Sequence, residues 1–412
     1  MKKIKVFGLI LGLVGIGLGS LFIWKCQAQP LVWEQDVKSL FHVIAEDMKT
    51  ERTISWQTEK EEESSQLELR EKGKAGSFLV EVAQEKIPTY QEGKNWIHTA
   101  NISGLKAGQE YEYRVLLGDR ASKWRNFKTE PESADSFKVL IFGDSQSVDY
   151  GVWKETAEVA FQRNPESAFF ISMGDLVDNG QDDWQWRVWL EGGKNLFAEM
   201  PIAPITGNHE MYNLDWKPAK PEIFLSLFQV PKNGPAGMEG YTYSYDYGDV
   251  HFVVLNTQLT ELAEWYPDLL EKQAEWLEAD LEKSQKKWTV VMMHRSLWRF
   301  PFDGPLDKIG QAFMPVFDRH EVDVVFIGHV HSYSRTKPIR RGEIDPAGTV
   351  YIATGRSGDR VWERSPKKPV DEVFYNPIDQ PNYLTFTGSK EKLTVKNFRQ
   401  DGTLIDETEI RK

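Results

Sequence analysis

Side chains that bind metal ions recur at five places in this sequence, most of them directly after an apolar run. The five segments are Gly143-Asp144, Gly174-Asp175, Gly207-Asn208-His209-Glu210, His294 and Gly328-His329-Val330-His331. Their carboxylate, amide and imidazole groups suit Fe, Mn or Zn, whereas the single cysteine, Cys26, excludes a thiolate site. Together the segments supply enough ligands for two metal ions that share Asp175.

A site with two such ions is suited to the hydrolysis of phosphate esters. Cations roughly 3.5 to 4 Å apart acidify a water between them and neutralise the charge that gathers on the phosphoryl oxygens. Each histidine or Gly-Asp pair taken alone is more often structural, because Gly-Asp pairs are common in turns. The recurrence of five such segments is what indicates a site.

The apolar runs before these segments predict the elements that position them. Residues 137–142, 168–173, 288–293 and 322–327 are typical of buried parallel strands, which present their ligands at the carboxyl edge of a sheet. Helical patterns over residues 152–163, 183–199, 269–285 and 308–320 lie between them. We therefore expect residues 136–412 to form an α/β domain with helices on a central mixed sheet, completed by strands from residue 382 onward.

Residues 32–131 have a different pattern, with short alternating runs separated by turns. This predicts an all-β antiparallel sandwich. Tyr111 begins one of the strands after a Gly108 turn, where its hydroxyl can bond back to the main chain. The segment resembles a fibronectin type III domain, specifically the one that precedes the catalytic domain of purple acid phosphatases. We expect it to act as a spacer and partial lid, because it contains no catalytic set.

Residues 1–30 predict export from the cytoplasm. A basic start, Met1-Lys2-Lys3-Ile4-Lys5, precedes an uncharged apolar stretch over residues 6–24. This is the pattern of a signal peptide cleaved before Gln29, and the stretch also approaches the length of a membrane anchor. Both outcomes stay open, so the exported protein is expected to be extracellular or at the cell surface.

The net charge limits the partners that this chain can bind. The formal charge of −12 over 412 residues argues against binding to a nucleic-acid polymer, which requires a basic surface. A small phosphorylated substrate remains compatible with it, because metal ions supply positive charge locally.

The order of the five segments resembles that of the calcineurin-like metallophosphoesterases over residues 137–400. Residues 328–336 and 349–355 look like purple acid phosphatases in particular. This resemblance implies that Asp144 and His331 hold one metal, that Asn208, His294 and His329 hold the other, and that Asp175 bridges them. It also implies that a hydroxide between the metals attacks phosphorus, while His209 donates a proton to the leaving group or stabilises the transition state.

Two positions depart from the purple pattern. Asp178 stands where the purple enzymes have a tyrosine, three residues after the bridging aspartate. Gln146 stands where they have a glycine and where other metallophosphoesterases have a histidine ligand. We therefore expect a colourless site that holds Fe(III) less strongly and contains Mn, Zn or Fe(II). The amide oxygen of Gln146 is expected to be an additional ligand of the first metal.

The function expected from these observations is that of an exported acid phosphatase-like enzyme acting on phosphate monoesters. One alternative is a phosphodiesterase or nucleotidase with the same metals, and another is a cell-surface binding protein with a vestigial phosphatase domain. Several residues near the segments are candidates for substrate contact, although each is more simply explained as a solvated loop residue. They are Arg295, Trp298, Arg299, Arg335 and Arg356.

Overall fold

The computed structural model describes residues 31–32, 37–59, 61, 64–91, 95–298 and 306–412. The predicted export segment with Cys26, and the candidate Arg299, lie outside these ranges. Within them, no helix is both long and apolar enough to cross a membrane.

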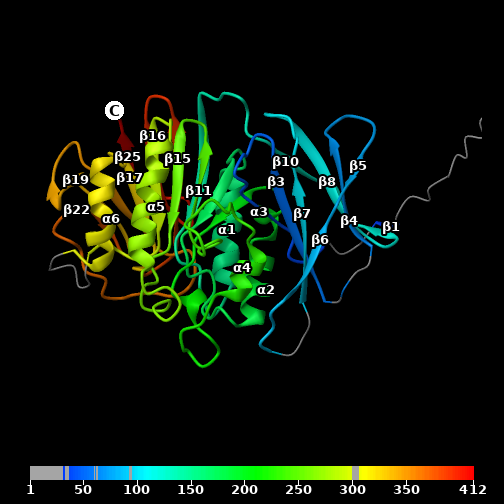
Figure 1. Ribbon diagram of the computed structural model, residues 1–412, viewed down its shortest axis with the longest axis horizontal. Coiled ribbons are helices and arrows are strands. Elements are labelled where there is room, and N and C mark those ends of the chain that lie inside the picture. Colours follow the sequence, from blue (N-terminus) through cyan, green and yellow to red (C-terminus); the bar gives the residue numbers. More distant parts are fainter. Residues whose placement is uncertain (1–30, 33–36, 60, 62–63, 92–94, 299–305) are drawn as a thin grey trace, which may run out of the picture.

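Two mixed sheets form the larger part of the fold and pack face to face (Figure 1). In the first sheet, three parallel strands are extended by three antiparallel ones: β11 (Ser136–Phe142), β12 (Phe169–Ser172), β13 (Pro201–Pro204), β23 (Asn382–Ser389), β24 (Leu393–Arg399) and β25 (Leu404–Ile410). The second sheet has four parallel strands at its centre: β15 (Val250–Leu255), β16 (Trp288–Met293), β17 (Val324–Ile327) and β21 (Val350–Thr354). Its outer strands are β14 (Tyr243–Tyr247), β18 (Tyr333–Thr336) and β22 (Asp371–Tyr375).

Aromatic side chains fill the space between these two sheets. Phe252 of the second sheet lies 5.6 Å from Phe169 and 5.8 Å from Phe386 of the first, measured between ring centroids. Large aromatic rings are the main source of apolar burial in such a core. The predicted α/β class and the strands at the end of the chain are confirmed, but there are two facing sheets instead of one central sheet.

Helices cover the outer faces of both sheets (Figure 1). Those on the first sheet are α1 (Gly151–Arg163), α2 (Asp183–Gly192) and α3 (Lys194–Phe197). On the second are α5 (Leu269–Lys283) and α6 (Lys308–Arg319), while α4 (Glu222–Leu227) lies near strand β6. The single helical stretch expected over residues 183–199 is interrupted at Gly193, whose backbone leaves the helical conformation.

The described residues between 31 and 128 form the all-β part of the molecule. One layer contains β1 (Leu31–Val32), β4 (Ser65–Glu71), β5 (Phe78–Val80), β8 (Glu110–Leu117), β9 (Arg120–Ala121) and β10 (Arg125–Lys128). The other contains β2 (Phe41–Val43), β3 (Arg52–Thr58), β6 (Ala83–Ile87) and β7 (Asn95–Ile102). The bond predicted for Tyr111 is confirmed, because its hydroxyl accepts the N–H of Lys106 at 2.9 Å.

A single sheet joins the two parts of the chain. Strand β2 pairs in parallel with β13, with His42 opposite Pro201 and Val43 opposite Ile202. The sheet therefore runs through ten strands, in the order β25-β24-β23-β11-β12-β13-β2-β3-β7-β6. Tyr113 adds a second link, donating from its hydroxyl to the main-chain oxygen of Ala198 at 2.7 Å. The boundary predicted at residues 131–136 stays a prediction, since the halves are continuous through this sheet.

His251 connects the second sheet to helix α5 through a buried charged group. Its Nδ1 lies 2.7 Å from Asp246 Oδ1 on β14, and its Nε2 lies 2.9 Å from Asp280 Oδ2 on α5. Burial alone would lower the pKa of His251, but its bonds to the two carboxylates outweigh burial and raise the pKa to about 9. The protonated ring can donate to both carboxylates at once.

We expect this group to make the stability of the fold depend on pH. An unfolded histidine has a pKa of about 6.5, so the stabilisation from protonated His251 is complete below that pH. It is lost as the pH rises through about 9, the pKa in the folded state. The full contribution is on the order of 3 kcal/mol, measurable by urea unfolding across this range.

A matched histidine provides the control for that measurement. Burial lowers the pKa of His98 to about 4, so this ring stays neutral throughout the range tested. His98→Gln should therefore keep the alkaline loss of stability, whereas His251→Gln should reduce it. An unchanged slope in His251→Gln would contradict this interpretation.

Candidate metal centre

The metal-binding side chains all follow strands whose carboxyl ends meet at one place. Strands β11, β12 and β13 of the first sheet lead to Asp144, Asp175 and Asn208. Strands β16 and β17 of the second lead to His294 and to the segment with His329 and His331. Two sheets thus deliver ligands from opposite sides of a single site.

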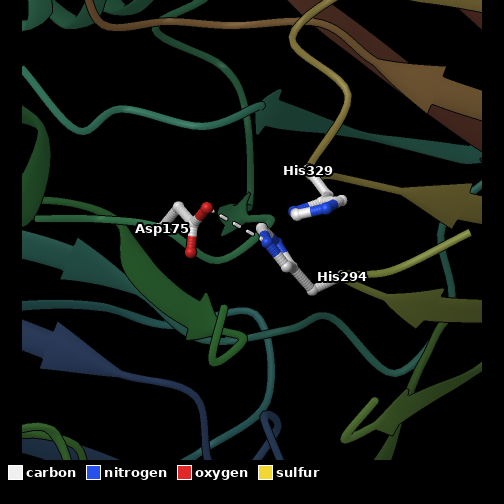
Figure 2. Close-up of side chains that lie close together, drawn as sticks. All are labelled: Asp175, His294 and His329. Atoms are coloured by element: carbon white, nitrogen blue, oxygen red, sulfur yellow. Dashed lines mark ion pairs between the residues drawn. The ribbon is translucent and has the colours of Figure 1, made fainter. Parts of the chain in front are cut away.

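Two groups of side chains lie close enough to hold metal ions. Asp175, His294 and His329 form one group, and Asp144, Asp175 and His331 form the other, with all ligand atoms of a group within 4.8 Å of one another. Figure 2 shows the first group, with Asp175 facing the ring of His294. Asp175 belongs to both groups, as expected for a residue that bridges two cations.

Several buried atoms of this cluster have no hydrogen-bond partner among the described residues. They are Asp144 Oδ2, Asn208 Oδ1 and His294 Nε2. Buried polar atoms are nearly always hydrogen-bonded, so three atoms without a hydrogen bond at one site require an explanation. His294 Nε2 lies 3.2 Å from Asp175 Oδ2, and His331 Nε2 lies 3.1 Å from Asp144 Oδ2. Cations would satisfy these atoms, so the residues present fit a pair of metals.

The remaining polar atoms of the ligands are fixed by bonds to the main chain. His294 Nδ1 lies 2.8 Å from Met173 O, and His331 Nδ1 lies 2.9 Å from Arg360 O. These bonds keep each Nε2 facing the site. Asp175 Oδ1 accepts the N–H of His209 at 2.9 Å, leaving Oδ2 for a cation. Such outer bonds orient metal ligands and fix their tautomers.

The ionisable side chains of the site favour a bound cation. Burial would raise the pKa of Asp175, but the imidazoles of His294 and His209 hold it well below its usual range. Burial likewise disfavours a charged His294, yet the Asp175 carboxylate raises the pKa of that ring to about 9. A bound cation would take the place of the proton on His294, because only the neutral imidazole binds a metal.

The backbone around the ligands is crowded and strained. A side chain at Gly207 would overlap Asp175 Oδ1, and one at Gly174 would come within 2.6 Å of His294 Nδ1. Asp175, His329 and His331 have positive φ angles of 51°, 70° and 53°, which residues other than glycine rarely adopt. Strain of this kind is typical of functional sites, where the surrounding structure must hold it.

Gln146 lies in contact with this cluster. In one amide orientation its nitrogen donates to Asp175 Oδ2 at 3.2 Å, and its oxygen accepts from His209 Nε2 at 3.1 Å. In the reverse orientation the amide oxygen lies toward Asp175 Oδ2. Two oxygens placed in this way could be ligands of the same cation. The sequence prediction that Gln146 binds the first metal stays a prediction, since the position supports either role.

Asp178, at the position of the tyrosine in the purple pattern, forms an ion pair with the guanidinium of Arg360. Its Oδ1 accepts from Arg360 Nε at 3.0 Å, and its other carboxylate oxygen also contacts this guanidinium. The main-chain oxygen of Asp178 bonds Nδ1 of His209 at 2.7 Å. That bond directs Nε2 of His209 toward Gln146 and the metal ligands.

The candidate substrate contacts are bound to other protein groups. Arg295 pairs with Glu261 at 2.7 Å beside His294, and Arg335 pairs with Asp406 at 2.7 Å and with Glu372. Arg356 is buried, and its guanidinium donates to main-chain oxygens such as Pro377 O. The expectation of solvated loop residues is therefore wrong for Arg335 and Arg356, which stabilise the fold.

Glu210 has a role that the sequence analysis did not assign. The side chain is buried, and its carboxylate accepts the N–H groups of Asp175 at 2.9 Å, Leu176 at 2.8 Å and Gly207 at 2.7 Å. It thereby fastens the loop that carries Asp175 to the loop that carries Asn208. The sequence feature that could have indicated this role is the acidic residue directly after Asn208-His209.

Comparison with known families agrees with this site. Residues 137–333 match the family described as calcineurin-like phosphoesterase, and residues 40–129 match the purple acid phosphatase N-terminal domain. The prediction of a two-metal centre is confirmed by this match together with the donor groups that the structure assembles. The identity of the metals and the assignment of each ligand stay predictions.

Two plant proteins and one solved structure are similar to this chain. Purple acid phosphatase 15 of Arabidopsis thaliana is 28% identical, covering 64% of this chain and 54% of the relative. Purple acid phosphatase 21 of the same plant is 30% identical, covering 69% and 63%. The chain thus spans less than two thirds of the length of either relative. The solved structure of a purple acid phosphatase from yellow lupin (Lupinus luteus) seeds has a TM-score of 0.79 at 19% identity, covering 91% of this chain and 74% of that one, which shows the shared fold.

We expect Glu210→Gln to weaken metal binding. The amide would place an N–H donor against main-chain donors, so one of the two loops would lose its acceptor. Apparent metal affinity should fall about 10- to 100-fold, measured by calorimetry with Zn²⁺ or Mn²⁺. Glu130→Gln is the matched control, since buried Glu130 accepts the N–H of Gly248 away from the ligands. Equal affinities in Glu210→Gln and wild type would contradict the positioning role.

Proposed function

Since this chain carries a purple acid phosphatase N-terminal domain followed by a calcineurin-like phosphoesterase domain, we propose that it is an exported two-metal hydrolase of phosphate monoesters. The observation that carries the proposal is the pair of ligand groups that share Asp175 and contain buried atoms with no partner among the described residues. A vestigial domain would gain nothing from keeping polar atoms without hydrogen bonds in its interior. The site therefore favours an enzyme over a cell-surface binding protein.

The proposed ligands divide between the two ions as the resemblance to the metallophosphoesterases implies. Asp144 and His331, with Gln146 as an additional ligand, would hold one ion, and Asn208, His294 and His329 the other, with Asp175 between them. When bound, the two cations would supply an activated water and neutralise the charge on the phosphoryl group.

His209 is the group that would act on the leaving oxygen. Its Nδ1 is held by the main-chain oxygen of Asp178, so that its Nε2 faces the cluster. Burial lowers the pKa of His209, but the Asp175 carboxylate, the bond to the main chain of Asp178 and the other nearby carboxylates together raise the pKa above its ordinary value. A protonated Nε2 can donate to the oxygen that leaves phosphorus or stabilise its charge.

Export is the second part of the proposal. It is supported by the basic start and the uncharged apolar stretch within residues 1–30. Comparison of the mass of the exported protein with that of the full chain distinguishes cleavage before Gln29 from retention as an anchor.

Hydrolysis of two model esters tests the activity. The metal-loaded protein should hydrolyse an aryl phosphate faster than a bis-aryl phosphate, and Asp175→Ala should lower both rates by about a hundredfold or more, because both cations lose a ligand. Asp119→Ala, a change at an exposed aspartate of the all-β part, should leave the rates unchanged. Equal rates in Asp175→Ala and wild type would refute an enzyme that uses this site, and a preference for the diester would favour the phosphodiesterase alternative.

The visible spectrum tests the role of Asp178. Since a carboxylate paired with Arg360 replaces the tyrosine, the Fe(III)-loaded protein should lack the strong charge-transfer band of a tyrosinate. Asp178→Tyr should introduce such a band, and Asp178→Asn should not. A strong band in the wild-type protein would contradict the colourless site.

A further inference from the structure

An exposed tryptophan lies beside the proposed leaving-group histidine. Trp216 is 54% exposed, and its ring centroid lies 6.0 Å from that of His209, with the two rings nearly perpendicular at 87°. Tyr212 lies 6.1 Å from Trp216 and 6.0 Å from His209, so the three rings form one cluster. Leu214, in the same loop, is 41% exposed. An apolar surface therefore adjoins the position where a leaving group would depart.

The loop that carries Trp216 is held in place by its own hydrogen bonds. Asn213 Oδ1 accepts the N–H groups of Asp215 at 3.0 Å and Lys217 at 2.9 Å, and Asn213 O accepts that of Trp216 at 2.9 Å. Asn179 Nδ2 donates to the same Asn213 oxygen at 2.7 Å. Because Asn179 directly follows Asp178, this bond links the Trp216 loop to the loop that begins at the bridging aspartate.

The backbone conformation of Trp216 is strained. Its φ angle of 60° is unfavourable for a bulky side chain, and glycine would adopt it without strain. Burial of the indole does not compensate, since about half of it stays in contact with solvent. A strained residue with an exposed aromatic ring at the edge of a site is typical of a ligand contact.

Trp362 provides a contrast on another side of the site. Its ring stacks on His331 at 5.2 Å and 30°, and it also lies 5.6 Å from His329. Trp362 thus covers two metal ligands, whereas the ring neighbours of Trp216, His209 and Tyr212, are residues that we assign to no metal. The exposed surface of Trp216 is free to contact a substrate.

We propose that Trp216 is a specificity-determining residue that stacks on the planar aromatic part of the leaving group. The inference rests on the proposed phosphoesterase function and adds the substrate class, which is phosphate esters of an aromatic ring. Stacking on tryptophan tolerates many planar rings because each presents a π-face. A phenol and a nucleobase share this chemistry, and the experiment distinguishes them.

The test compares substrates in wild type, Trp216→Ala and Trp216→Phe. Trp216→Ala should lower kcat/KM for phenyl phosphate by about five- to a hundredfold, the range expected for one lost stacking contact. The same variant should leave kcat/KM for ethyl phosphate within about twofold, since that substrate has no ring to stack. Trp216→Phe should retain most of the activity on phenyl phosphate. A parallel loss on adenosine 5′-phosphate would extend the class to nucleotides, and a loss confined to phenyl phosphate would restrict it to small aryl esters.

Stability and a matched variant separate stacking from a structural role. Trp216→Gly should not lower the melting temperature, because glycine relieves the positive φ. Phe78→Ala removes a ring of similar exposure, 52%, from strand β5 of the all-β part. This variant should leave kcat/KM unchanged for both substrates. Equal losses on phenyl and ethyl phosphate, or no loss on either, would overturn the proposal.

A binding measurement keeps this test independent of catalysis. Calorimetry of the metal-loaded protein should give weaker binding of phenylphosphonate to Trp216→Ala than to wild type, with unchanged binding of ethylphosphonate. If wild type hydrolyses neither ester, the proposed function fails, and the phosphonates still decide the role of Trp216. Identical phenylphosphonate affinities in the two proteins would refute stacking.

Discussion

The fold concentrates acidic and imidazole groups in a volume that only positive charge can stabilise. Asp144 and Asp175 are each about 1% exposed, and together with three histidines they form two groups whose ligand atoms all lie within 4.8 Å. Removal of carboxylates from water costs free energy unless a partner compensates. Imidazolium protons compensate in part, as the opposite pKa displacements of Asp175 and His294 show. Two cations would compensate fully and would also engage the oxygens of Asp144 and Asn208 that accept no hydrogen bond.

Rigid elements impose this arrangement on the ligands. The ligands that follow parallel strands of both sheets converge on one place, so they arrive on short segments with little freedom. Four of the seven described non-glycine residues with positive φ lie in or beside the site, namely Asp175, His329, His331 and Trp216. Glu210 and the bonds from the histidine Nδ1 atoms to main-chain oxygens hold these segments in place. Free energy gained by apolar burial between the two sheets offsets the strain in these segments.

Much of this arrangement could be predicted from the sequence, because apolar runs that end on ligand residues encode both the strand and its carboxyl end. Asp144, Asp175 and His294 were predictable for that reason. The amide orientation of Gln146 and the burial of Arg356 depend on contacts between segments distant in the chain, which no local pattern reports. Trp216 also gave no signal, since an exposed tryptophan in a polar loop resembles many others. The interruption at Gly193 was missed because the apolar spacing continues across it.

The pairing of β2 with β13 has a consequence for the autonomy of the two halves. A catalytic fragment that lacked the first 130 residues would expose the edge of β13 to solvent. The main-chain oxygen on β13 that accepts the N–H of Ile44 would then have no partner. Open strand edges promote association between molecules. Such a fragment would tend to self-associate, so the two halves are better regarded as one cooperative folding unit than as an enzyme with a detachable module.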